Sequence, residues 1–163
     1  MRQLAAQFEG KEIFSSTPYT ERCVLTLIST SSGEEGLRAF ITYLHQILEE
    51  SSADEVLKCR QGDFLSLEDW LGINEIPQNV AEIYEESKSF LYNLNRLRNF
   101  YSHLANAKDV FEVGKIYSRL IGKFRPEEGD VEKTKVVLLE QSIRALNGFD
   151  EALRSILENR FQR

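Results

Sequence analysis

The sequence predicts an all-α fold, an antiparallel bundle of about five helices that forms one domain over residues 1–163. Apolar residues recur along the chain at spacings of three and four, which is the period of an amphipathic helix. No alternating strand pattern persists, and no internal repeat is apparent. The chain has 3 prolines and 9 glycines, mostly at junctions between these segments. With 163 residues, 42% hydrophobic and 28% charged, it can bury the core of one globular domain.

The first two helices have recognisable start signals. Thr17 followed by Pro18 is typical of an N-cap and a first helical residue, so we expect a helix from Pro18. Its apolar stripe would consist of Val24, Leu27 and Ile28. Residues 32–35, Ser-Gly-Glu-Glu, resemble a capping box at the start of the second helix. The buried face of that helix is expected to contain Leu37, Phe40, Ile41, Leu44, Ile47 and Leu48.

Residues 51–76 interrupt this pattern. They are mixed in character and are broken by Gly62, Gly72 and, just after them, Pro77. We expect a loop with short helices here, including one over residues 66–71. A long helix should follow, and its apolar stripe consists of Val80, Ile83, Tyr84, Phe90, Leu91, Leu94 and Leu97, with a possible continuation to Tyr101 and Leu104.

Two further helices complete the prediction. Asn106 and Asp109 are candidate caps for the first of them, which is expected to bury Val110, Val113, Tyr117, Leu120, Ile121 and Phe124. Residues 125–130 are predicted to form a loop. The last helix carries an apolar stripe of Leu139, Ile143, Leu146, Leu153 and Ile156. Gly148 is a candidate kink within it, because Gly costs about 1 kcal/mol relative to Ala in a helix.

Composition argues against several classes of protein. No apolar run approaches the roughly 18 residues that a membrane span needs, and the N-terminus lacks the apolar core of a secretory signal. The 2 cysteines are too few for a disulfide scaffold and lack the spacing of a zinc site. We therefore expect a cytoplasmic protein that binds no membrane and uses no metal and no cofactor.

Charge is distributed unevenly along the chain. A net charge of −6 taken alone argues against a nucleic-acid partner. Residues 1–86 hold 6 basic and 16 acidic side chains, a net charge of −10, whereas residues 87–125 hold 8 basic and 2 acidic ones, a net charge of +6. Residues 126–163 have a net charge of −2. The basic segment is a candidate surface for a polyanion, and a solvated helix face is the alternative.

Several residues of this basic segment have side chains that could take part in catalysis. Of the 2 histidines, His45 adjoins the apolar stripe of the second helix and is expected to be a packing residue. His103 follows Arg96 by seven residues and Asn99 by four, so one helical face would hold all three. Arg98 would fall nearer the apolar side, where its guanidinium needs a partner or a bend in the helix.

These side chains suit acid–base chemistry on a phosphodiester. Imidazole gives and takes protons near neutral pH. A guanidinium binds phosphate through two parallel hydrogen bonds, and an asparagine amide can orient the imidazole or a phosphate oxygen. No acidic or cysteine cluster nearby in the sequence offers metal ligands. In RNA the ribose 2′-hydroxyl would be the nucleophile, leaving 2′,3′-cyclic phosphate and 5′-hydroxyl ends, and DNA lacks that hydroxyl.

The segment Arg98 to His103, Arg-Asn-Phe-Tyr-Ser-His, resembles the signature of HEPN-domain ribonucleases. In that signature a histidine follows an arginine after four to six residues, and a polar residue often comes directly after the arginine. The resemblance implies an all-α bundle that cleaves single-stranded RNA without a metal. It also implies that two motifs meet across a homodimer, and family members include toxins and antiphage effectors.

The resemblance assigns roles to individual residues. It makes Arg98 the phosphate-stabilising group, His103 the proton-transfer group and Asn99 the supporting polar residue. Arg96 also satisfies the looser spacing, with six residues before His103. The residues expected to contact the RNA are Arg96, Tyr101, Ser102 and Lys88.

One departure from the family and two alternatives bear on the partners. A toxin branch paired with nucleotidyltransferase antitoxins carries a modified tyrosine two residues after the histidine, where this chain has Ala105. That route of neutralisation is not expected here, although another protein antitoxin or regulator is possible. The first alternative is an acidic helical bundle without catalysis that binds a basic protein partner through residues 1–86. The second is a HEPN fold that binds RNA or a nucleotide without cleaving it.

Overall fold

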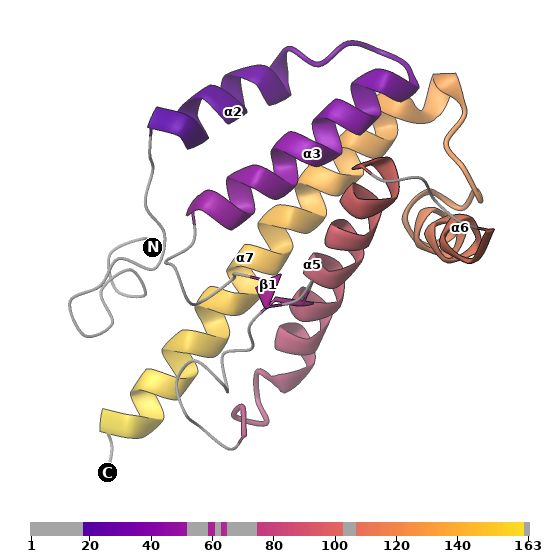
Figure 1. The fold of residues 1–163 in the computed structure, drawn as a ribbon. Coiled ribbons are helices and arrows are strands. Elements are labelled where there is room, and N and C mark those ends of the chain that lie inside the picture. Colours follow the sequence, from indigo (N-terminus) through magenta and orange to yellow (C-terminus); the bar gives the residue numbers. More distant parts are fainter. Residues whose placement is uncertain (1–17, 52–58, 61–62, 65–74, 103–106, 162–163) are drawn as a thin grey trace. The chain divides into compact units, whose positions relative to one another are not determined.

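The computed structural model describes residues 18–51, 59–60, 63–64, 75–102 and 107–161 (Figure 1). This part of the chain contains five α-helices, which confirms the all-α class. They are α2 (Pro18–Ile28), α3 (Glu34–Ser51), α5 (Ala81–Ser102), α6 (Ala107–Ile121) and α7 (Val131–Phe161). A 3₁₀ turn, η1 (Glu128–Asp130), precedes α7 within the segment that was predicted as a loop.

A short pair of strands lies where the sequence predicts a loop with short helices. β1 (Cys59–Arg60) pairs antiparallel with β2 (Asp63–Phe64), so that Cys59 faces Phe64 and Arg60 faces Asp63. Strands of two residues are too short to show an alternating pattern, which is why the sequence did not predict them. The short helix predicted over residues 66–71 lies outside the described residues.

The contacts within the chain separate it into two compact units. The described residues of unit 1 belong to Leu48–Tyr92 and Ser142–Arg163, and unit 2 contains Pro18–Ile47 and Asn93–Gln141. The helices α3, α5 and α7 each contribute one part to each unit. The end of α5, which carries the first five residues of the candidate motif, belongs to unit 2. A single domain over residues 1–163 stays a prediction.

Helix α2 begins at Pro18, as the sequence predicts. Its buried side chains are Cys23 and Leu27, four residues apart. The predicted stripe is wrong in part, because Val24 is exposed and Ile28 is 75% exposed. A short helix with adjacent apolar residues offers two possible apolar faces, and spacing alone could not select the buried one.

Helix α3 begins later than the predicted capping box requires. The Gly33 carbonyl accepts the first helical hydrogen bond, from the Leu37 amide at 3.0 Å, and Gly33 has a φ of 92°. A cap at Ser32 would make Gly33 the first helical residue, but helical residues have a negative φ. The predicted cap at Ser32 is therefore wrong. His45 is 1% exposed, as expected for a packing residue. The predicted apolar face is buried at Leu37, Phe40, Ile41, Leu44 and Leu48, and Ile47 is partly exposed.

Helices α5 and α6 largely bury the faces that their periodicity predicts. The fully buried apolar residues of α5 are Tyr84, Leu91, Leu94 and Leu97. Helix α6 starts directly after Asn106, which lies outside the described residues together with Leu104. Asp109 lies in the first turn of α6, so its predicted role as the cap is wrong. Val113 and Tyr117 are buried as predicted. Ile116, which was not among the predicted residues, is buried as well.

Helix α6 ends at Ile121, and the next residue, Gly122, adopts a φ of 73°. Phe124 therefore lies beyond the helix and is 45% exposed, which corrects its predicted burial. The Phe124 ring centre lies 6.2 Å from that of Phe111. The same ring covers Gly114, where an added Cβ would collide with it.

Helix α7 runs without interruption from Val131 to Phe161. Leu139 and Ile143 are exposed, so the predicted buried stripe is wrong at these two positions. The buried face instead consists of Val131, Leu138, Ala145, Phe149, Ala152, Leu153 and Ile156. Two residues of this face are alanines, which a prediction based on large apolar residues does not include.

Gly148 permits a close approach of α7 to α5 within unit 1, which replaces the predicted kink. A Cβ added at Gly148 would collide with Oγ of Ser87, and it would lie 3.1 Å from the Ile83 carbonyl oxygen. One residue further along, the ring of Phe149 meets the ring of Tyr84 edge-on, with 5.4 Å between their centres. The missing side chain therefore lets these two helices pack tightly.

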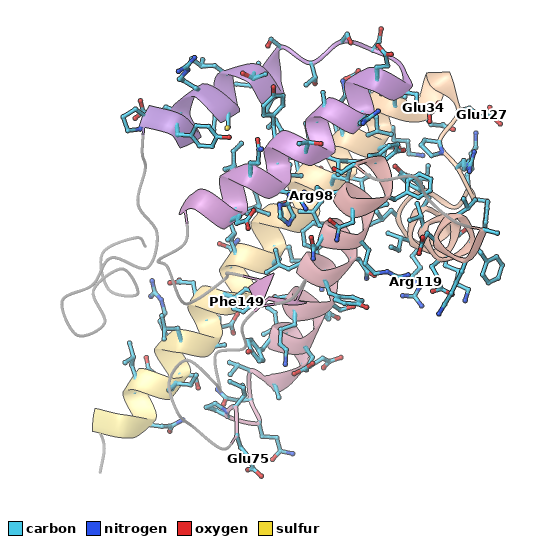
Figure 2. All side chains as sticks on the ribbon, in the orientation of Figure 1. Glu34, Glu75, Arg98, Arg119, Glu127 and Phe149 are labelled. Atoms are coloured by element: carbon cyan, nitrogen blue, oxygen red, sulfur yellow. The ribbon has the colours of Figure 1, made fainter. Side chains whose placement is uncertain are left out.

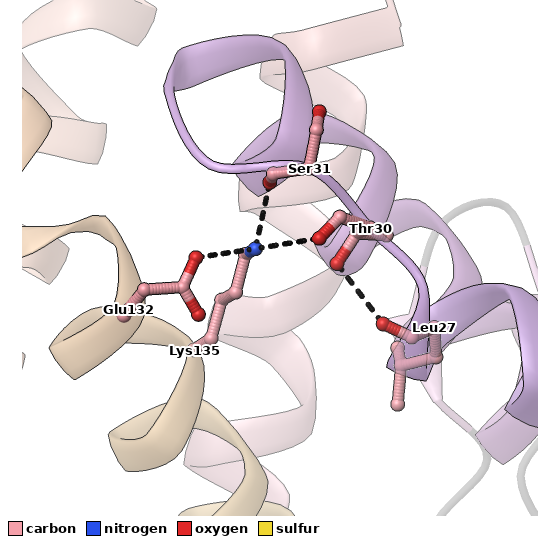
Figure 3. Close-up of polar contacts among 5 residues, drawn as sticks. All are labelled: Leu27, Thr30, Ser31, Glu132 and Lys135. Carbon is pink, nitrogen blue, oxygen red and sulfur yellow. Dashed lines mark hydrogen bonds and ion pairs between the residues drawn. The ribbon is translucent and has the colours of Figure 1, made fainter.

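A buried lysine joins α7 to the connection between α2 and α3 in unit 2 (Figure 3). Lys135 is 5% exposed. Its ammonium donates to the carbonyl oxygens of Ser31 at 2.9 Å and Thr30 at 3.4 Å, and to Oε1 of Glu132 at 2.9 Å. Three acceptors match the three donors of the ammonium, so the charge can be buried here.

We expect Gly148→Ala to lower the free energy of unfolding by about 1–3 kcal/mol. The added methyl would displace the Ser87 hydroxyl from its 2.7 Å hydrogen bond to the Ile83 carbonyl. Helix propensity alone predicts the opposite sign, a gain of about 1 kcal/mol. Urea denaturation measures the difference. Gly129→Ala is the control, because an added Cβ there meets no atom. A stabilised Gly148→Ala protein would contradict the close approach.

Replacing the buried ammonium should also be costly. We expect Lys135→Met to lower the free energy of unfolding by about 2–4 kcal/mol, because the Thr30 and Ser31 carbonyls lose their buried donor. The matched control is Lys133→Met, which removes an exposed ammonium from the same helix and should change stability by less than about 0.5 kcal/mol. Equal losses in the two variants would show that the buried contacts contribute nothing specific.

Candidate functional site

Five of the residues expected to act on RNA lie in the last two turns of α5, in unit 2. They are Arg96, Arg98, Asn99, Tyr101 and Ser102. Because α5 continues to Ser102, these side chains all project from one regular helix, as the periodicity predicts. His103, the expected proton-transfer residue, comes directly after α5 in the sequence and lies outside the described residues.

Arg98 and Asn99 are joined through their side chains. Nη1 of Arg98 donates to Oδ1 of Asn99 at 2.8 Å, and both residues are half-buried. Figure 2 labels Arg98 on α5. Among the described residues no carboxylate forms an ion pair with Arg98. The neutral amide thus orients the guanidinium without neutralising its positive charge, which suits it to bind phosphate.

Arg96 is held by a carboxylate instead. Its Nη1 lies 3.6 Å from Oε2 of Glu112 on α6. Lys115 donates to the other oxygen of this carboxylate at 2.8 Å. The hydrogen bond from Lys115, followed by the charges of Lys115 and Arg96, lowers the pKa of Glu112, so Glu112 is ionised at neutral pH. Because Arg96 is paired in this way, Arg98 is the better candidate for the working arginine.

Tyr101 is paired with Tyr117 of α6. Their hydroxyl oxygens lie 2.7 Å apart, and either can donate. Burial raises the pKa of both phenols above the ordinary value, so both hydroxyls keep their protons at neutral pH. One proton lies between the two oxygens, and the described residues offer no acceptor for the other. The pair can therefore donate one hydrogen bond to a ligand.

Lys88 and Ser102 have different surroundings. Ser102 is the exposed last residue of α5. Lys88 belongs to unit 1, where its Nζ lies 3.1 Å from Oε1 of Glu85 and 5.1 Å from the centre of the Tyr84 ring. The structure thus groups Lys88 with these two residues of unit 1.

A cavity of about 290 Å³ shares two residues with the motif, and all of its lining belongs to unit 2. The lining residues that bear on its chemistry are Phe100, Tyr101, Tyr117, Glu34 and Arg125. Glu34 is the first residue of α3 (Figure 2), and Arg125 follows α6. Neither residue, nor Tyr117, was predicted to belong to a site. No motif in the sequence connects them, because the fold alone brings these segments together.

The described residues also limit the classes of site. None of their helices combines the length and apolarity needed to cross a bilayer. Nor do three or more His, Cys, Asp or Glu side chains among them cluster in a way that could hold a metal ion. No model of a protein family, no curated protein and no solved structure matches this chain.

We expect at least two of the 6 tyrosines to stay protonated in the folded protein above the ordinary tyrosine pKa of about 10. Since burial raises the pKa of Tyr101 and Tyr117 only in the folded state, the unfolded chain loses these protons first. The free energy of unfolding should therefore fall as the pH rises above about 10. The tyrosine protons that are lost only above about pH 10 are called the late protons here. Tyrosinate absorbance during an alkaline titration measures their number.

Two variants serve to assign the late protons. Tyr117→Phe should remove one of them. Tyr92→Phe, which replaces an exposed tyrosine of α5, is the matched control for the removal of a hydroxyl. Titration of all tyrosines in one step near pH 10, with the protein still folded, would contradict the buried hydroxyl pair.

Proposed function

We propose that this protein is a metal-independent endoribonuclease that cleaves single-stranded RNA to 2′,3′-cyclic phosphate and 5′-hydroxyl ends. The observation that carries the proposal is the Arg98–Asn99 pair, a half-buried guanidinium that an amide orients and no described carboxylate neutralises. This pair precedes His103 in the segment that resembles the HEPN signature. A guanidinium, an amide and an imidazole are the groups that this reaction needs.

The reaction divides the work among these residues. A histidine acting as base takes the proton of the ribose 2′-hydroxyl, and the 2′-oxygen attacks the adjacent phosphorus. Arg98 stabilises the negative charge that grows on the phosphoryl oxygens. The bond from phosphorus to the 5′-oxygen then breaks, and the leaving oxygen takes a proton from an acid. Asn99 keeps the Arg98 guanidinium in place throughout.

The proposal extends to assembly and biological role. One His103 per chain supplies either the base or the acid, and a homodimer would supply both. The resemblance to HEPN proteins points to a cytoplasmic toxin or antiphage effector, which a protein antitoxin or regulator would restrain. The single-stranded RNA partner follows from the need for a free 2′-hydroxyl aligned with its phosphate.

The test is cleavage of single-stranded RNA by the purified full chain in EDTA, with analysis of the ends produced. We expect cyclic phosphate ends, and no cleavage of DNA with the same sequence. His103→Ala and Arg98→Ala should each lower the rate at least about 100-fold, because each removes a group that acts only in the transition state. Circular dichroism checks that the variants fold.

Two matched variants sharpen this test. Arg119→Ala removes an exposed arginine of α6 (Figure 2), and Arg96→Ala removes the arginine that Glu112 holds. Both should stay within about tenfold of the wild-type rate. Loss of cleavage in Arg96→Ala but not in Arg98→Ala would assign the reaction to the other arginine. If the wild-type protein leaves the RNA intact, the proposal is wrong.

A further inference from the structure

The cavity beside the motif has a buried floor and a charged rim. Leu37, Val113, Tyr117 and Val131 line it and are almost completely buried, whereas Glu34 and Arg125 are exposed. Phe100 adds an aromatic wall and packs edge-on against Tyr101, with 5.2 Å between the ring centres. A cavity with apolar and aromatic walls and a few polar groups is the usual form of a small-ligand site.

The floor offers a directed hydrogen bond. Tyr101 and Tyr117 both line the cavity, and their paired hydroxyls hold one proton more than the bond between them uses. Glu34 and Arg125 line the same cavity as these hydroxyls, and the charge of Glu34 raises the pKa of both hydroxyls whereas that of Arg125 lowers it. A ligand in this cavity would therefore meet a neutral hydrogen-bond donor and two opposite charges.

The two charges on the rim are available. Among the residues that the structure describes, Glu34 and Arg125 form no ion pair with each other or with another side chain. A carboxylate accepts two parallel N–H groups, and a guanidinium donates to two adjacent acceptors. The matching ligand is planar, with two neighbouring donors on one edge and two neighbouring acceptors next to them.

Guanine is the nucleobase with this arrangement. Its N1–H and 2-amino groups are adjacent donors, and its O6 and N7 are adjacent acceptors that arginine binds in pairs. Adenine and cytosine each offer an amino group but no second donor beside it. Aromatic side chains hold an unstacked base by its faces, and Phe100, which belongs to the motif itself, is an aromatic residue of the cavity lining.

We infer that this cavity is a guanine-binding site, in which Glu34 accepts from N1–H and the 2-amino group and Arg125 donates to O6 and N7. The inference rests on the proposed function for its source of guanine, which is a nucleotide of the RNA strand close to the cleaved bond. A free guanine nucleotide carries the same base and would occupy the same cavity.

The test is titration calorimetry of the wild-type full chain with GMP, AMP, CMP and UMP, none of which contains a bond that the enzyme could cleave. GMP should bind at least about tenfold more tightly than the other three, because a bidentate base contact discriminates by at least that much. Cleavage of short single-stranded RNAs that differ at one base then distinguishes the source. A rate that depends on guanine near the cut identifies the strand, and GMP binding without such dependence identifies a free nucleotide.

Matched variants connect the preference to the rim. Glu34→Gln should lower the affinity for GMP at least about tenfold, and Glu35→Gln, which removes the neighbouring exposed carboxylate from the same helical turn, should leave it within about twofold. Arg125→Gln and Arg119→Gln form a second pair with the same expected contrast. Equal effects within either pair, or four nucleotides that bind with similar affinity, would overturn the inference.

These experiments distinguish a failure of the guanine site from a failure of the proposed ribonuclease activity. RNA cleavage without a preference for GMP would keep the proposed function and remove the guanine site. GMP binding that Glu34→Gln abolishes, in a protein that leaves RNA intact, would keep the site and remove the ribonuclease.

Discussion

The buried ammonium of Lys135 fixes the chain path on which the rest of unit 2 depends. It holds the Ser31 carbonyl against α7, and the chain then turns through Gly33, whose φ of 92° leads directly into α3. The packing at this turn leaves no room, because a Cβ added at Gly36 would collide with the Ser31 carbonyl. Glu34, which lines the cavity, follows this turn directly. The contacts of the buried ammonium and the candidate site therefore lie on one short stretch of chain.

Ion pairs within the basic segment decide which of its charges remain available. Described carboxylates hold Lys88, Arg96, Lys115 and Lys123. Among the described residues, the cations of this segment without an ion pair are Arg98, Lys108, Arg119 and Arg125. All four belong to unit 2. Phosphate binding depends on the charges close to the phosphate rather than on the net charge of −6, so the acidic composition of the chain does not exclude a phosphate at Arg98.

Periodicity predicted α3 and α5 well because each helix has one continuous apolar face. It failed on α7, where the exposed Leu139 and Ile143 are larger than the alanines of the buried face. At the site, the sequence placed Arg98 and Asn99 on one helix but could not choose between Arg96 and Arg98. The carboxylate that pairs with Arg96 and so favours Arg98 as the candidate, Glu112, lies on another helix. The cavity escaped prediction for the same reason, since only the fold assembles its lining.

The ion pair that holds Arg96 persists over the pH range in which an ordinary histidine titrates. The hydrogen bond from Lys115 lowers the pKa of Glu112, so this carboxylate stays ionised, and Arg96 stays paired, when an imidazole changes charge near pH 6.5. The raised pKa of Tyr101 keeps its hydroxyl neutral there as well. If the proposed cleavage depends on pH near 6.5, the ion pair between Arg96 and Glu112 is therefore not the group whose protonation changes.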